Sequence, residues 1–137
     1  MSAKVALEYL EHVQADLDAA WSCARGERPS LTIAAYHVQQ AAEKLIKAAL
    51  VAQSIDPPYT HNLHDLSSLL GRGKGEDPRF VRLTRFTAYA IAFHYPGEDV
   101  GAPIPTTADI DAWVAEIEAL KADFERSLAA RDEDAQP

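Results

Sequence analysis

The chain has 137 residues, of which 47% are hydrophobic and 25% are charged. This size and composition are typical of one folded domain and exclude a disordered or fibrous chain. Thirteen lysines and arginines stand against 21 aspartates and glutamates, so the formal net charge is -8. Such a charge repels a phosphate backbone at long range, which argues against duplex DNA as a partner and restricts any contact with a polyanion to a local site.

The single cysteine, Cys23, excludes an intramolecular disulfide framework and fits a reducing compartment. Acidic residues interrupt the first thirty positions at helical spacing, so we expect no secretory signal there. The longest apolar runs, such as 48–52, are far shorter than the roughly 20 residues that a membrane span requires. We therefore expect a cytoplasmic protein that does not associate with a membrane.

Two long amphipathic helices are predicted in the first half of the chain. Apolar residues recur every three or four positions over 4–24, which indicates the first helix. Gly26 and Pro29 end it, and Ser30 is placed to cap the next helix. That second helix, over 31–53, has a broad apolar arc rich in alanine, which would let another helix approach closely.

Three further helices are predicted downstream. A proline pair precedes a short third helix over 62–70, which is expected to end in the glycine-rich loop 71–75. An Asp-Pro pair, typical of an N-cap and the first helical position, opens a fourth helix over 77–94. Thr106 and Asp109 have the spacing of a capping box and open the fifth helix.

The order of these elements predicts the fold class. Short connections make neighbouring helices antiparallel, and no strand pattern or internal repeat is found. We therefore predict an all-α fold, an antiparallel up-and-down bundle of four or five helices, in a single domain over 1–131. Residues 132–137 are predicted to form a polar C-terminal tail.

The outward side of the second helix carries a mixed polar stripe. At 100° per residue, one third of its circumference holds Tyr36, His37, Gln40, Glu43, Lys44 and Lys47. The lysines could neutralise phosphate while Tyr36 or His37 stacks on a base, as in single-strand and nucleotide sites. A solvent-exposed face or a dimer interface would show the same residue pattern, so all three interpretations stay open.

Five histidines raise the question of a metal site. His61, His64 and Asp65 could present three donors from one short helix. No cysteine lies nearby in the sequence, and its place at the start of a helix explains His61 as a capping or hinge residue. We expect no metal site and no cofactor. The sequence also lacks a Gly-x-Ser-x-Gly elbow, a Walker loop and a dinucleotide fingerprint.

Three motifs occur in order along the chain: Ala-Tyr-His-Val-Gln-Gln-Ala-Ala-Glu-Lys-Leu-Ile-Lys-Ala over 35–48, Thr-His-Asn-Leu over 60–63, and Phe-His-Tyr-Pro-Gly over 93–97. They resemble the helix-2 signature, the Thr-His-Asp-Leu opening of helix 3 and the Arg-Tyr-Pro ending of helix 4 in the HEPN domain family, the higher eukaryote and prokaryote nucleotide-binding domains. The resemblance covers nearly the whole chain. It implies an up-and-down helical bundle, usually a homodimer, often encoded beside a small nucleotidyltransferase in a two-gene module that resembles a toxin–antitoxin system.

The resemblance also bears on catalysis, because many members of the family are metal-independent ribonucleases. They use an arginine followed, after four to six residues, by a histidine on the penultimate helix. This sequence lacks that spacing; its nearest pair, Arg85 and His94, has eight residues between. On one continuous helix the two side chains lie on opposite faces and cannot converge within one subunit. Enzymatic activity therefore stays open, with ribonuclease the activity that the resemblance indicates.

Three hypotheses follow. The first is a HEPN-like protein that partners a small nucleotidyltransferase in a toxin–antitoxin-like module and binds a nucleotide or RNA end. Its binding residues would be Tyr36, His37, Gln40, Lys44, Lys47 and His61. The second is a ribonuclease toxin with His94 as general acid or base in an active site assembled at a homodimer interface. The third is a structural or adaptor dimer without a small ligand, in which the polar stripe is a protein interface. Whichever hypothesis holds, His94 lies among apolar positions on the helical wheel, so a hydrogen-bonded interior histidine is an alternative interpretation of this residue.

Overall fold

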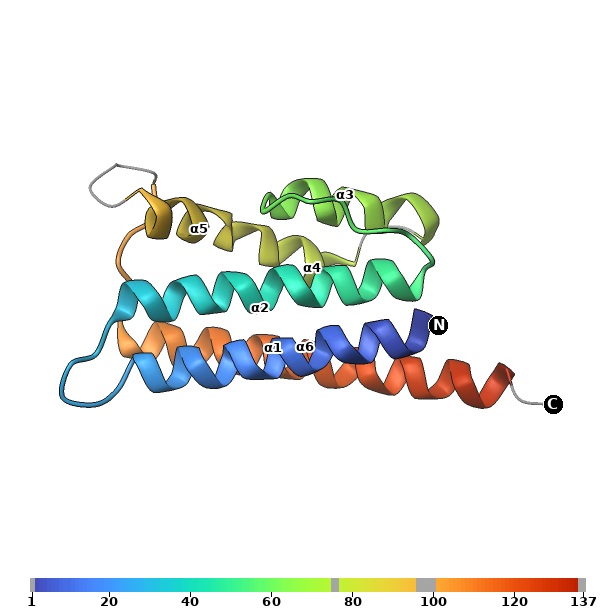
Figure 1. Ribbon diagram of the computed structural model, residues 1–137, viewed down its shortest axis with the longest axis horizontal. Coiled ribbons are helices and arrows are strands. Elements are labelled where there is room, and N and C mark those ends of the chain that lie inside the picture. The colour runs from blue at the N-terminus through green and yellow to red at the C-terminus, as the bar shows by residue number, and fades with distance from the viewer. Residues whose placement is uncertain (1, 75–76, 96–100, 136–137) are drawn as a thin grey trace.

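The computed structural model describes residues 2–74, 77–95 and 101–135. Its elements are α1 (Ser2–Cys23), α2 (Leu31–Ala52), α3 (Leu63–Lys74), α4 (Pro78–Arg82), the 3-10 helix η1 (Leu83–Phe86), α5 (Thr87–His94) and α6 (Thr107–Ala135). In the view of Figure 1, α2 lies between the α1/α6 pair and the layer of α3, α4 and α5. The predicted all-α antiparallel bundle is confirmed, and no described helix has the length and apolarity to cross a lipid bilayer.

The hairpin of α1 and α2 is the most extensive helix–helix contact of the bundle. Fully buried alanines, Ala6 and Ala20 on α1 and Ala34 and Ala41 on α2, permit close packing because they add no side chain beyond Cβ. At the turn, Ser30 Oγ accepts a hydrogen bond from the Ile33 backbone N–H at 3.3 Å. The predicted N-cap of α2 is therefore confirmed, and it starts the helix that carries the polar stripe.

The prediction of a single helix over 77–94 is wrong, because the structure divides this segment into α4, η1 and α5. In a 3-10 helix, residues three apart lie on the same side, and η1 thereby turns both Leu83 and Phe86 into the core. The Thr84 hydroxyl donates to the Val81 carbonyl at 2.7 Å, a local bond that supports the tighter turn. Tertiary packing at η1 thus outweighs the regular helical periodicity.

The C-terminal ends of α3 and α6 also differ from expectation. α3 continues to Lys74, so four residues of the predicted loop 71–75 are helical, since extending a formed helix by a turn costs little. α6 continues to Ala135, into the predicted tail 132–137. Gly75, the Pro-Gly end of the motif at 93–97 and residues 136–137 lie outside the described residues.

The capping box that opens α6 is confirmed. The Thr106 N–H donates to Asp109 Oδ2 at 2.9 Å, and the Asp109 N–H donates to Thr106 Oγ1 at 3.1 Å. One turn later, Arg25 binds both carboxylate oxygens of Asp111 at 2.8 and 2.7 Å. This pair fixes the start of α6 against the end of α1, which closes the bundle at the end where α2 begins.

Asp77 caps α4, as the sequence predicts, and also binds Arg79. Its Oδ1 accepts from the Arg79 backbone N–H at 2.9 Å, and Oδ2 lies 3.1 Å from Arg79 Nη2. The Arg79 guanidinium, more than the backbone N–H, holds the pKa of Asp77 below its ordinary value, although desolvation acts in the opposite direction. The folded state therefore favours the ionised carboxylate.

A charge-specific substitution tests this interaction. Because the folded-state pKa of Asp77 is depressed, its stabilisation is present above about pH 4 and is lost as the pH falls through the folded-state value. Asp77→Asn keeps a capping side chain but removes the charge, so we expect a loss of about 0.5 kcal/mol in the free energy of unfolding at pH 7, limited by solvent screening. Urea titrations should show this difference shrinking as the pH falls below about 4. A difference that does not change with pH would contradict the assignment.

Candidate functional site

A buried carboxylate on α1 binds the polar stripe of α2. Asp16 is 9% exposed. Its Oδ2 accepts a hydrogen bond from Lys44 Nζ at 2.6 Å, and its Oδ1 lies 3.0 Å from His37 Nδ1. Lys44 and His37 lie two turns apart on α2, so one carboxylate holds two positions of that helix against α1.

A second buried carboxylate, Glu43, lies on α2 itself and is 3% exposed. Its Oε2 accepts from Lys47 Nζ at 3.2 Å, and its Oε1 lies 2.8 Å from His61 Nδ1 in the segment before α3. Oε1 also accepts from Gln39 Nε2 at 3.3 Å, and Gln39 Oε1 accepts from Gln40 Nε2 at 2.7 Å. This network satisfies the buried carboxylate and ties the start of α3 to α2.

An aromatic group lies at the other end of the stripe, where α5 ends. The rings of Tyr36 and Phe93 are stacked, with centroids 4.0 Å apart and an angle of 14° between their planes. The His94 and His37 rings stand edge-on to Tyr36, at centroid distances of 6.0 and 5.7 Å. Phe93 and His94 are exposed. The group therefore joins an accessible ring surface to the polar residues of α2.

We define the α2 face as Tyr36, His37, Gln40, Lys44 and Lys47, the partly exposed positions of the stripe. The structure brings this face together with His61 at one end and with Phe93 and His94 at the other. Two lysines balance the two buried carboxylates, so the formal charge of the cluster is zero when its imidazoles are neutral. A phosphate would thus meet cations that already have partners, although each ammonium has three N–H donors and can serve a further acceptor.

Three expectations about individual residues are corrected by these contacts. Glu43 belongs to the buried network rather than to an exposed stripe. His94 is exposed, so the interior-histidine interpretation is wrong. The cap of α3 is Asn62, whose Oδ1 accepts from the backbone N–H groups of His64 and Asp65 at 2.9 and 3.3 Å, and His61 instead binds Glu43.

The break at η1 does not bring Arg85 and His94 together. Arg85 Nη2 donates to Glu116 Oε1 on α6 at 2.9 Å, and its guanidinium lies 4.2 Å from the Phe86 ring centroid. The His94 ring packs instead against α2. The arginine–histidine pair of the family's ribonucleases is therefore not assembled within this subunit. Over residues 2–74, 77–95 and 101–135, no cluster of three or more His, Cys, Asp or Glu side chains is arranged to hold a metal ion.

Sequence reasoning missed Asp16, Gln39 and Phe93 as members of this site. Gln39 lies four residues after Ala35 and three before Ala42, on the buried arc of α2, so helical geometry alone could have marked it as a buried polar residue. Asp16 precedes the buried Leu17 and lies at the edge of the apolar arc of α1, a weaker signal. No sequence signal pairs Phe93 with Tyr36, since their stacking depends on how α5 meets α2.

The fold and the site define a small helical bundle with a polar and aromatic face on its second helix. Comparison with known families agrees: the HEPN domain model matches residues 6–127 of the 137-residue chain. The chain therefore belongs to the HEPN domain family, and membership supports a function related to nucleotides or RNA. No curated protein and no solved structure matches it.

Removing the Asp16 carboxylate should destabilise the fold. Asp16→Ala leaves Lys44 and His37 partly buried without their acceptor, and breaking a fully buried pair costs about 3–5 kcal/mol. Because both partners can turn toward water, we expect a loss of about 2 kcal/mol in the free energy of unfolding, measured by urea titration. Asp18→Ala, on the exposed side of α1, is the matched control and should cost less than about 0.5 kcal/mol. Equal losses of stability in the two variants would contradict the assignment of Asp16 as the acceptor that holds Lys44 and His37.

Proposed function

We propose that this protein binds a nucleotide or an RNA end on the α2 face and partners a small nucleotidyltransferase in a toxin–antitoxin-like module. The observation that supports binding most strongly is the alignment of the Tyr36–Phe93 ring pair with Lys44 and Lys47 along one side of α2. Base stacking at the rings and phosphate contacts at the lysines are the two elements that single-strand sites combine.

The spacing along α2 favours a ligand with several phosphates in a row. At a rise of 1.5 Å per residue, Lys44 lies about 12 Å along the helix from Tyr36, and Lys47 lies about 17 Å from it. A base on the exposed ring of Phe93 would continue the stack, and the phosphates that follow would run toward the lysines. A nucleoside triphosphate or a short RNA end fits this distance better than a nucleoside monophosphate.

The buried carboxylates set the character of the proposed binding. Because Asp16 and Glu43 already neutralise Lys44 and Lys47, a phosphate gains hydrogen bonds from the ammonium groups but little net Coulomb attraction. Stacking then supplies much of the affinity, at about 1–3 kcal/mol per base. We therefore expect the binding affinity to fall less steeply with rising salt concentration than it would at a site with two unpaired lysines.

The nucleotidyltransferase partnership, like the homodimer, rests on the resemblance of the three ordered motifs to the HEPN family. Co-expression with a small nucleotidyltransferase encoded by the adjacent gene tests it directly. A stoichiometric complex in size-exclusion chromatography with light scattering is the expected result. Separate elution of the two proteins, or the absence of such a gene next to this one, would contradict the proposed partnership. Binding on the α2 face would be tested separately.

Two substitutions test binding on the α2 face. Phe93→Ala removes the exposed ring and should weaken binding of a 5′-phosphorylated adenylate trimer about tenfold, from the loss of stacking. Lys44→Gln keeps a donor for Asp16 but removes the charge, and should weaken binding about fivefold. Fluorescence anisotropy with a labelled trimer measures both.

Lys4→Gln, at an exposed position near the start of α1, is the control for a change of one positive charge and should bind the trimer normally. Normal affinity in both Phe93→Ala and Lys44→Gln would show that the α2 face is not the site. A protein that binds neither the trimer nor ATP but does form the complex would be an adaptor.

A ribonuclease is the second candidate, because His94 is exposed beside the α2 face and an arginine could come from a second copy of the chain. If the protein cleaves single-stranded RNA with His94 as general acid or base, His94→Ala should lower the rate at least 100-fold without changing the melting temperature. His64→Ala, at an exposed position of α3, should keep the full rate. Cleavage that survives in His94→Ala would remove this residue from the mechanism.

A further inference from the structure

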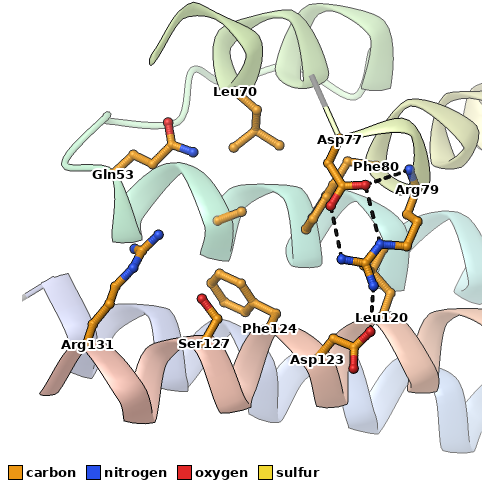
Figure 2. Close-up of a pocket in the computed structure, with 11 residues that line it drawn as sticks. Gln53, Leu70, Asp77, Arg79, Phe80, Leu120, Asp123, Phe124, Ser127 and Arg131 are labelled. Atoms are coloured by element: carbon orange, nitrogen blue, oxygen red, sulfur yellow. Dashed lines mark hydrogen bonds and ion pairs between the residues drawn. The ribbon is translucent and has the colours of Figure 1, made fainter. Parts of the chain in front are cut away.

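A pocket of about 350 Å³ lies away from the α2 face, where the ends of α2 and α3 meet the start of α4 and the second half of α6. Figure 2 shows its two ends and the apolar side chains between them. Leu70 and Phe80 are buried in the wall, and the Phe124 ring lies across the middle. The volume is within the range of small-molecule sites, and Leu70, Phe80 and Phe124 give the middle of the wall an apolar surface.

At one end of this pocket, the described cations are paired with carboxylates. Arg79 binds Asp77 through Nε and Nη2 and Asp123 through Nη1. Asp123 also binds Arg126. Asp77 and Asp123 thus balance Arg79 and Arg126, so the formal charge of these four side chains is zero and a second negative group on a ligand would find no unbalanced cation among them.

Arg131 lies at the opposite end of the pocket. Among the described residues Arg131 forms no ion pair, and its Nη1 donates one long hydrogen bond, 3.5 Å, to the Ala52 carbonyl. A guanidinium has five N–H donors, so most of them remain available to a ligand. Gln53 and Ser127 lie at the same end and add an amide and a hydroxyl.

We propose that this pocket binds a monoanionic aromatic acid, with its carboxylate on Arg131 and its ring between Phe124 and Phe80. The described charges favour one negative group at the Arg131 end, because the cations at the other end are already balanced by Asp77 and Asp123. This site shares no residue with the α2 face. Binding in this pocket can therefore be tested independently of nucleotide binding.

The test uses a pair of probes that differ only in charge, 2-naphthoate and its neutral amide, 2-naphthamide. Isothermal titration calorimetry should show one naphthoate bound per chain, at least tenfold more tightly than the amide. Arg131→Gln should remove that preference, because the carboxylate loses its only unpaired cation among the described lining residues. Ser127→Trp, at an exposed position of α6, fills the pocket and should abolish binding of both probes.

Two controls accompany these binding measurements. Arg28→Gln, at an exposed position in the loop before α2, removes an equal charge at the end of α2 opposite to the pocket and should bind naphthoate normally. Circular dichroism melting checks that each variant folds. The proposal is overturned if the two probes bind alike, if Arg131→Gln keeps the preference, if Ser127→Trp still binds, or if naphthoate does not bind at millimolar concentration.

Discussion

The ion pairs of two buried carboxylates determine what the surface of α2 can do. Asp16 holds Lys44 and His37, and Glu43 holds Lys47 and His61. A buried carboxylate without its cations destabilises the fold. Moving Lys44 or Lys47 away from its carboxylate would therefore lower the free energy of unfolding. The cations of α2 are therefore fixed in place and largely neutralised before any ligand arrives. A ligand has to add to these pairs rather than replace them, which gives stacking and hydrogen bonding more weight than net charge.

The same contacts assemble the site from separate parts of the chain. The close packing of alanines sets α1 against α2, and Asp16 lies within that interface. Glu43 binds His61 and so ties the segment before α3 to α2, while the Tyr36–Phe93 stack connects the end of α5 to the start of α2. Three elements thus meet along one helix. Each of these contacts therefore fixes a different element against α2.

Local signals in the sequence account for most of the architecture. Helical periodicity predicted the long helices, and the caps at Ser30, Asp77 and Thr106 predicted where α2, α4 and α6 begin. The division of the segment 77–94 could not be predicted, because η1 is favoured by the burial of side chains against elements far away in sequence. The burial of Glu43 was missed for the same reason, since its partner His61 comes from a different segment. Periodicity places a residue on one side of its own helix, but it does not indicate which distant side chain will cover it.

The central claim is that the α2 face is where the ligand binds. It is tested most directly by following the amide resonances of the ¹⁵N-labelled protein in two-dimensional NMR spectra while a 5′-phosphorylated adenylate trimer is added. Resonances of residues 36–47, the segment around His61 and the end of α5 should shift together and saturably. Shifts confined to the pocket that contains Arg131, or a spectrum that does not change at millimolar trimer, would contradict the claim.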